Sequence, residues 1–284
     1  MEKKIVLCAD STCDLSPELK ERYHVHCFPF HVILEDKTYG DGYDLMPDQI
    51  YEVYRARKVL PKTAAINMAE YAEFCQQWLG EDCDVIYITI GSGLSAAFNN
   101  CRMAAEGLPG MYAVDSRNLS SGTGLLVIAA AERIAAGLPA AQIAQELNEL
   151  TAHVESSFII DTLEFLYKGG RCSALAMMGA NVLKLKPCIE VDNTSGAMGV
   201  GKKYRGSLDK ALVQYVQDRL EGRTDIDTRR IFITHSGISD ERVELVRKEI
   251  AKYQDFDEIL VTRAGCTISS HCGPNTLGIL FMTK

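Results

Sequence analysis

Residues 88–100 read ITIGSGLSAAFNN, and the fold class can be inferred from this stretch. The apolar run from Asp84 to Ile90 predicts a buried strand, the small residues 91–95 predict a loop, and a helical pattern follows to about Glu106. A strand that passes through a small-residue loop into a helix is the building unit of a parallel α/β sheet. Such a junction directs backbone N–H groups and hydroxyls toward a ligand.

The same alternation extends through the first half of the chain. Further buried strands are predicted at Lys4–Ala9, Val25–Leu34 and Met111–Val114. Between and after them, caps and helical periodicity predict helices over 17–23 (after the N-cap Ser16), 47–58, 68–79 (after the N-cap Asn67), 122–136 and 139–154. We expect a parallel sheet with helices on both faces.

The pattern changes near Glu155, so we expect two domains, residues 1–154 and residues 155–284. Two apolar runs flank the turn Asp192–Gly196 and predict a hairpin. The remaining elements expected here are strands at 157–160, 187–191, 198–204, 231–234, 259–261 and 277–282, helices at 162–168, 173–184, 208–220 and 240–253, and a polar connector at 223–228. A hairpin among helices indicates a smaller α/β domain with a mixed sheet.

The composition excludes several classes of function. The chain has 284 residues, a net charge of −8 and 47% hydrophobic residues, as in a globular protein without affinity for nucleic acid or anionic membranes. Neither a signal peptide nor a run of about 20 apolar residues is present, so a cytoplasmic protein is expected. The ten cysteines form no zinc-type spacing, and we interpret most of them as buried thiols.

Ligands of parallel α/β sheets bind beyond the carboxyl ends of the strands. That rule brings together residues 10–12, residues 91–95, Asp115 and Ser116, with Thr63 added if its loop folds over the same edge. We expect Asp10 and Asp14 to cap the first helix and close its turn rather than to perform chemistry.

The loop at 91–95 allows more than one function. Gly91-x-Gly93-x-x-Ala96, with Asp115 about twenty residues on, matches a dinucleotide fingerprint, so an NAD-dependent oxidoreductase is one alternative. Its place in the middle of a domain and its extra hydroxyls, Ser92 and Ser95, argue against that alternative. A phosphosugar-binding or isomerase-like protein is another. The nucleophile elbow G-x-S-x-G is out of phase here.

Other polar clusters lie elsewhere along the chain. His24 and His26 share one face of their predicted strand while Cys27 and His31 share the other, so no metal site is expected. Gly169-Gly170-Arg171 offers bare backbone and a guanidinium that suit a carboxylate or phosphate, and Arg205-Gly206 repeats that pattern. His271 is expected in a small-residue loop over 269–274.

Taken together, these segments resemble the DegV family of fatty-acid-binding proteins over the whole chain. The matching segments are Asp10–Leu15, Pro61–Thr63, Ser92–Ser95, Val114–Ser116, Leu166–Arg171, Lys203–Gly206 and His271–Pro274. The resemblance implies two α/β domains with a long-chain fatty acid, such as palmitate or oleate, between them. It implies no enzymatic activity, cofactor or metal in the chain itself.

The resemblance also implies roles for particular residues. Thr63 and Ser95, with Ser92 and Gly93 nearby, would bind the carboxylate, to which His271 is also close. Arg171, Arg205 and His271 would face a separate fatty acid kinase that makes acyl phosphate for phospholipid synthesis. The family loops P-x-T-S-x-P, S-S-G-L-S-G and H-x-G-P-G are altered here at Ala64, Ile66, Gly91, Ala96 and Asn275. Apolar residues proposed for the wall are Phe28, Phe30, Ile33, Phe165, Leu166, Leu175, Met177, Met178, Val182 and Leu183.

Overall fold

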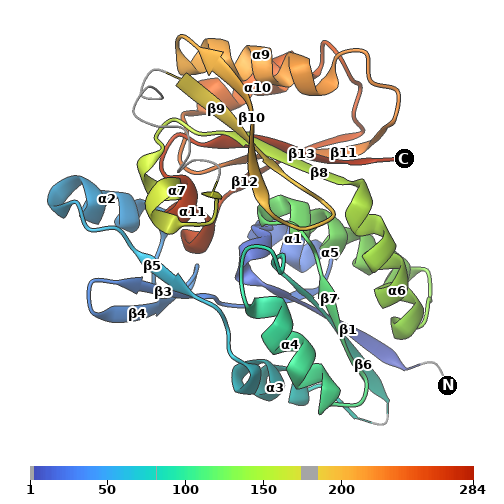
Figure 1. Ribbon diagram of the computed structural model, residues 1–284. Coiled ribbons are helices and arrows are strands. Elements are labelled where there is room, and N and C mark those ends of the chain that lie inside the picture. The colour runs from blue at the N-terminus through green and yellow to red at the C-terminus, as the bar shows by residue number, and fades with distance from the viewer. Residues whose placement is uncertain (1–2, 81, 174–184) are drawn as a thin grey trace.

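The computed structural model describes residues 3–80, 82–173 and 185–284. Two β-sheets lie one above the other, and a small third sheet projects from one side (Figure 1). The strands of the lower sheet come from residues 4–115, and those of the upper sheet come from residues 154–283.

The lower sheet is parallel throughout, as predicted. Its strand order is β2-β1-β6-β7, with bounds Val25–Phe28, Lys4–Asp10, Cys83–Thr89 and Met111–Asp115. The helices of this half are α1 (Pro17–Arg22), α3 (Met68–Gln76), α4 (Ala97–Glu106), α5 (Ser120–Ala135) and α6 (Ala140–Leu150), with 3₁₀ turns at Ser11–Cys13 (η1) and Thr151–His153 (η2). Because the strands run in one direction, their carboxyl ends meet at one edge.

The prediction of one strand over 25–34 is wrong. The run divides at Pro29, and its second part is β3 (His31–Leu34), which belongs to a separate antiparallel sheet. A proline has no N–H for a sheet ladder, and its fixed φ lets the chain leave the first sheet. The other strands of the small sheet are β4 (Lys37–Gly40) and β5 (Lys62–Ala64), and α2 (Pro47–Arg57) lies between them in sequence.

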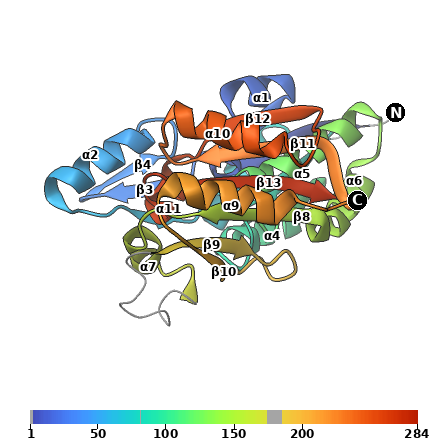
Figure 2. The ribbon, with the colours of Figure 1, turned by 90° about the horizontal axis from the view of Figure 1, so that it is seen from above.

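This small sheet and α2, residues 31–64, are called the arm below. Figure 2 shows that the arm extends away from both larger sheets. Its β5 pairs with β3 so that Thr63 lies opposite Val32. The arm therefore brings Thr63 back toward the carboxyl edge of the parallel sheet.

The upper sheet has six strands and is mixed, as predicted. Its pairings are antiparallel except for that of β11 with β12. The order is β10-β9-β8-β13-β11-β12, with bounds Met198–Arg205, Leu185–Val191, Val154–Ile159, Leu277–Thr283, Ile226–His235 and Glu258–Arg263. Helices α9 (Leu208–Leu220) and α10 (Asp240–Ile250) cover its outer face (Figure 1).

Two further expectations for this half need correction. The polar connector at 223–228 is partly strand, because β11 begins at Ile226 and pairs there with Thr283. The predicted loop around His271 is a short helix, α11 (Cys266–Cys272), which is terminated by Gly273 with a φ of 74°. The predicted helix over 173–184 lies, apart from Ser173, outside the described residues. The short helix predicted at 162–168 is α7 (Glu164–Gly169).

Helix α5 lies between the two large sheets. Its Leu125 and Ile128 share one buried cluster with Ile88 of β6 below and with Phe232 and Leu280 of β11 and β13 above. A helix that is apolar around most of its circumference is stable only when it is covered on all sides. The two sheets thus share a core, and cavities can form where that core opens. In the described part of the chain, no helix is long and apolar enough to cross a membrane.

Candidate functional site

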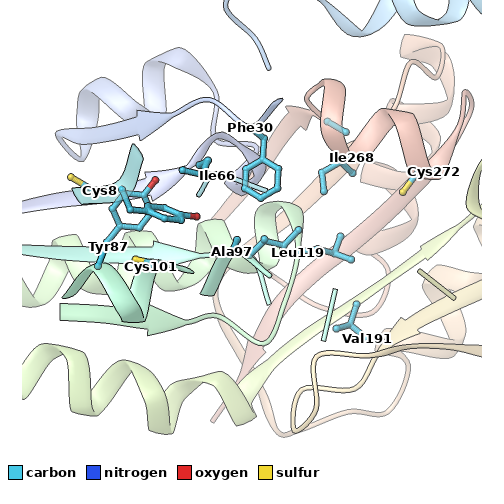
Figure 3. Packing of buried hydrophobic residues seen from close by; sticks show 14 of the residues in the cluster. Cys8, Phe30, Ile66, Tyr87, Ala97, Cys101, Leu119, Val191, Ile268 and Cys272 are labelled. Atoms are coloured by element: carbon cyan, nitrogen blue, oxygen red, sulfur yellow. The ribbon is translucent and has the colours of Figure 1, made fainter. Parts of the chain in front are cut away.

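A pocket of about 520 Å³ opens between the sheets and the arm. It lies at the carboxyl edge of the parallel sheet, below α11 and beside the start of α5. Figure 3 shows Phe30, Leu119, Ile268 and Cys272 from its wall. Among the described residues, those that line it are Phe30, Thr63, Ala65, Ile90, Leu94, Ser95, Leu119, Arg171, Met198, Thr267, Ile268, His271 and Cys272. One polar group of side chains thus faces a largely apolar wall.

Thr63 and His271 meet at the polar end of this pocket. The Thr63 Oγ1 lies 2.9 Å from the His271 Nε2, although the two residues are 208 positions apart in the sequence. If Nε2 carries the imidazole proton and donates it to the threonine, the Thr63 hydroxyl hydrogen is left for a ligand. The arm and α11 are brought together by the fold to create this pair.

Ser95 contributes a second hydroxyl from the end of the 91–95 loop. Its Oγ accepts the backbone N–H of Ala97 at 3.2 Å, at the beginning of α4. Within the described ranges no residue accepts the serine O–H hydrogen, which can donate toward the pocket. The first turn of α4 adds partial positive charge, which also suits an anion.

Ser92 and Gly93 do not line the pocket. The Ser92 N–H and hydroxyl both donate to Asp115, at 3.0 and 2.5 Å. Gly93 faces the turn of the β9–β10 hairpin, where a Cβ would lie 2.5 Å from the Ser195 carbonyl oxygen. These two residues therefore shape the loop and join it to the upper sheet. The dinucleotide alternative assigned the Asp115 carboxylate to a ribose, but this carboxylate already accepts both hydrogen bonds from Ser92.

The two predicted arginines lie in different places. Arg171 lines the pocket, and its Nη1 donates to the Gly169 carbonyl oxygen at 2.6 Å. Arg205 ends strand β10, opposite Leu185, and does not line the pocket. Of the predicted wall residues, Phe30 lines this pocket, while Phe28, Ile33, Phe165 and Leu166 do not. Leu175, Met177, Met178, Val182 and Leu183 lie outside the described residues.

Gly169 permits His271 to occupy its position. A Cβ on Gly169 would lie 2.3 Å from the His271 Nδ1, closer than any side chain tolerates. Burial and the neighbouring Arg171 guanidinium lower the pKa of His271 to about 4. The imidazole is therefore neutral at physiological pH, and it polarises Thr63 without adding a full charge.

Two buried carboxylates hold the amino end of α11, and sequence analysis did not identify this role. Asp41 accepts the N–H groups of Cys266 and Thr267 at 2.6 and 3.2 Å, and Asp14 accepts that of Gly265 at 2.8 Å. The expectation that Asp14 caps the first helix is wrong, because Ser16 caps α1. No local pattern marks a partner about 225 residues away.

Asp10 and Ser11 connect the strand ends around the pocket. The Asp10 carboxylate accepts the Ile90 N–H at 2.9 Å and also the hydroxyls of Tyr71 and Tyr87. The Ser11 hydroxyl donates to Asp41 and accepts the Phe30 N–H. Burial raises the pKa of Asp10 to about 7, and it raises the pKa of Asp14 well above its usual value. These residues position the site and do not line it.

A second cavity of about 310 Å³ continues from the first. Both are lined by Leu119, Ile268 and Cys272, so the apolar surface is continuous from one to the other. The second cavity extends beneath α11 to Phe158 and Leu280 of the upper sheet. The two adjoining cavities are called the passage below; Thr63, Ser95, Arg171 and His271 line its first part, and the lining of its second part also includes Ser120, Thr234, His235, Ser236 and Thr276.

One departure from the family motifs has a clear structural explanation. Asn275 replaces the last glycine of the H-x-G-P-G segment and adopts a φ of 60°. Asparagine tolerates this left-handed conformation better than most residues, and its side chain donates to Asp161 at 3.1 Å. Ile66, at the altered proline position of the Thr63 loop, is completely buried.

Comparison with solved structures identifies this architecture as the two-sheet α/β fold of DegV proteins. A Thermus thermophilus protein, described as a fatty-acid-binding DegV family protein, superposes with a TM-score of 0.87 and 29% identity, covering 99% of this chain and all of that one. DegV from Bacillus subtilis, described as a fatty acid binding protein, gives a TM-score of 0.81 and 27% identity over the full length of both chains.

Sequence comparison agrees. The family model described as "Uncharacterised protein, DegV family" matches residues 4–284. A DegV domain-containing protein of Deinococcus radiodurans is 30% identical over 97% of both chains. The chain belongs to the DegV family, as the sequence motifs indicated. Nothing in these comparisons supports the dinucleotide-binding alternative.

Proposed function

We propose that this protein binds one long-chain fatty acid between its two sheets and does not itself catalyse a reaction. The observation that carries this proposal is a largely apolar passage whose first part gathers Thr63, Ser95, Arg171 and His271. The descriptions of the T. thermophilus and B. subtilis relatives as fatty-acid-binding support it.

The polar end suits a single carboxylate. Thr63 and Ser95 can each donate a hydroxyl hydrogen, and His271 fixes the orientation of Thr63. Arg171 adds positive charge at the same pocket. Hydrogen bonds to a charged acceptor contribute about 1.5–3 kcal/mol each. We therefore assign the carboxylate to Thr63 and Ser95.

The tail would extend through the second cavity. Burying a methylene contributes about 0.8 kcal/mol, so a chain of about fourteen methylenes gains on the order of 10 kcal/mol before the entropy losses of binding. The shared residues Leu119, Ile268 and Cys272 would contact the middle of the chain.

We further propose that the bound carboxylate is presented to a separate fatty acid kinase, which would transfer the phosphoryl group. Arg171 lies at the carboxylate end and would stabilise the added charge. Arg205 is exposed on β10 and is proposed to contact the partner. Incubating the lipid-loaded protein with a purified bacterial fatty acid kinase and ATP tests this step, and acyl phosphate is the expected product.

Lipid extraction tests the central proposal. The purified protein is denatured, and mass spectrometry of the organic extract is expected to show a long-chain fatty acid. The delipidated protein is then titrated with oleate and palmitate. Absence of lipid in the extract together with no uptake of either acid would refute the proposal.

Substitution of the two hydroxyls tests the assignment of the carboxylate. Thr63→Val and Ser95→Ala should each weaken oleate binding by about 10- to 150-fold, because each removes a donor to a charged group. Thr63→Ser, which keeps the hydroxyl, should bind nearly normally. Thr38→Val on the exposed β4 makes the same chemical change within the arm and should have no effect. Unchanged affinity in the double variant would show that the carboxylate lies elsewhere.

A further inference from the structure

Two cysteines near the carboxyl edge of the parallel sheet, one after β1 and one on β2, lie in contact. The Cys13 Sγ is 3.8 Å from the Cys27 Sγ, close enough for a thiol–thiol hydrogen bond. Neither residue lines the fatty-acid pocket. We propose that this pair is a redox-active dithiol, which a peroxide converts into an intramolecular disulfide.

The backbone on both sides of the pair is fixed by the fold. Cys27 lies on the edge strand β2, opposite Ala9 of β1, and Cys13 lies in the 3₁₀ turn η1 that directly follows β1. The Asp14 carboxylate, at the end of that turn, accepts hydrogen bonds from the Ser120 hydroxyl and the Gly265 N–H. The pairing of β2 with β1 and the turn that follows β1 therefore fix the positions of the two sulfur atoms.

The surroundings give the two thiols different tasks. Cys13 is fully buried, whereas Cys27 is half-buried and is the more exposed residue of the pair. The hydrogen bond from Cys13, with the nearby Lys20 ammonium, lowers the pKa of Cys27, while the pKa of Cys13 is raised. The thiolate is the reactive form, so Cys27 attacks the oxidant and Cys13 resolves the product.

The chemistry balances with hydrogen peroxide as the oxidant. The Cys27 thiolate attacks one peroxide oxygen, an S–O bond forms, the O–O bond breaks, and hydroxide leaves and takes up a proton as water. The Cys13 sulfur then attacks the Cys27 sulfur, an S–S bond forms, and the S–O bond breaks. The second water leaves with the Cys13 proton. Two thiols are oxidised and one peroxide is reduced.

Oxidation would join η1 to β2 beside the residues that support the site. Asp14 follows Cys13 directly and binds the backbone at the start of α11. The disulfide would close the segment that contains α1. A cross-link that constrains the unfolded chain raises stability, so the melting temperature should increase on oxidation.

Peptide mapping of the full-length protein after treatment with hydrogen peroxide is the direct test. It is performed on both delipidated and lipid-loaded protein, so that it does not depend on fatty acid binding. We expect a Cys13–Cys27 cross-linked peptide lacking two hydrogen atoms, and reversal by dithiothreitol. Absence of this peptide in both preparations would overturn the proposal.

Trapping of the intermediate separates the two roles. In Cys13→Ala, dimedone should label Cys27, because no thiol remains to resolve the sulfenic acid; in Cys27→Ala, Cys13 should stay unlabelled. Cys83 is the matched control, since it is also partly exposed but bonds to the Asp84 carbonyl oxygen and not to a second thiol. If hydrogen peroxide oxidises Cys27 no faster than Cys83 in the wild-type protein, the proposal is wrong.

Discussion

His271 lies where α11, α7 and β5 meet, and each neighbour determines part of its chemistry. The arm provides Thr63 as its hydrogen-bond partner, Gly169 leaves room for the ring, and Arg171 disfavours protonation. Nδ1 is buried without a hydrogen-bond partner among the described residues. A histidine with these surroundings remains neutral, and its main effect is to orient the threonine hydroxyl.

The lowered pKa of His271 predicts how its contribution to stability depends on pH. The folded-state pKa of about 4 lies below the usual 6.5, so the unfolded chain takes up a proton first as the pH falls. The contribution of neutral His271 to the free energy of unfolding is complete above pH 6.5. It declines as the pH falls below 6.5 and is lost once the pH has fallen through about 4. Between these values the free energy of unfolding should drop with pH more steeply than in His271→Gln, by up to about 1.4 kcal/mol per pH unit. Urea unfolding at several pH values measures the difference.

The pH prediction has a clear failing outcome. Parallel curves for the wild-type protein and His271→Gln over that range would mean that His271 titrates normally. The variant keeps a side-chain donor near Thr63, so packing changes little. Other titrating groups, including Asp10, contribute equally to both curves and cancel in the comparison.

Gly169→Ala should weaken fatty acid binding through His271. The new Cβ would lie 2.3 Å from Nδ1, so the ring must move and the contact with Thr63 is lost. We expect roughly a tenfold increase in the Kd for oleate, which corresponds to one hydrogen bond of about 1.4 kcal/mol. Gly199→Ala on β10 is the control, because nothing lies within 4 Å of its added carbon. Equal effects of the two substitutions would exclude this mechanism.

At the scale of elements, α11 depends on residues outside itself. A seven-residue helix is too short to be stable alone. Asp14 and Asp41 accept three backbone N–H groups at its start, where the helix dipole also favours negative charge. Through this helix, residues of the first half of the chain position Ile268, His271 and Cys272 in the pocket wall.

Asp41→Asn should therefore destabilise the protein. The amide can accept one of the two N–H groups but presents its NH₂ group to the other, and the charge at the helix start is lost. We expect the free energy of unfolding to fall by about 1–3 kcal/mol, as measured by urea denaturation.

Asp48→Asn provides the comparison for Asp41. Asp48 pairs with Arg263 but its side chain is 75% exposed, and exposed ion pairs contribute less than about 1 kcal/mol. A loss for Asp41→Asn no greater than that for Asp48→Asn would show that Asp41 does not stabilise α11.

For the whole molecule, the important feature is that both sheets contribute to one passage. Leu119 lies directly before α5, and Phe158 and Leu280 lie on β8 and β13. A ligand in this passage would contact residues of both halves of the chain at once. Binding and the stability of the whole fold are therefore coupled.

Removal of the lipid should lower the melting temperature, and added oleate should restore it. A ligand at one hundred times its Kd stabilises the folded state by about 2.7 kcal/mol. Differential scanning calorimetry of native, delipidated and reloaded protein measures the effect. Octanoate, which fills only part of the passage, is the control and should restore less. Identical melting temperatures before and after delipidation would contradict a fatty acid site between the sheets.

Much of the fold could be predicted from the order of residues along the chain. Alternating strand and helix periods predicted the parallel sheet and the hairpin, Ser16 and Asn67 marked real helix starts, and ordered motifs along the chain identified the DegV family. These signals succeed because periodicity, caps and turns depend on neighbours within a few positions.

How distant segments meet could not be predicted from local patterns and is seen in the folded chain. The division of residues 25–34 at Pro29, the helix that contains His271 and the role of Asp41 all follow from contacts between residues far apart in sequence. The passage between the sheets exists only after those contacts form. Local patterns fix which elements form, but a pocket wall is a set of long-range contacts, and its energy depends on the packing of the whole molecule.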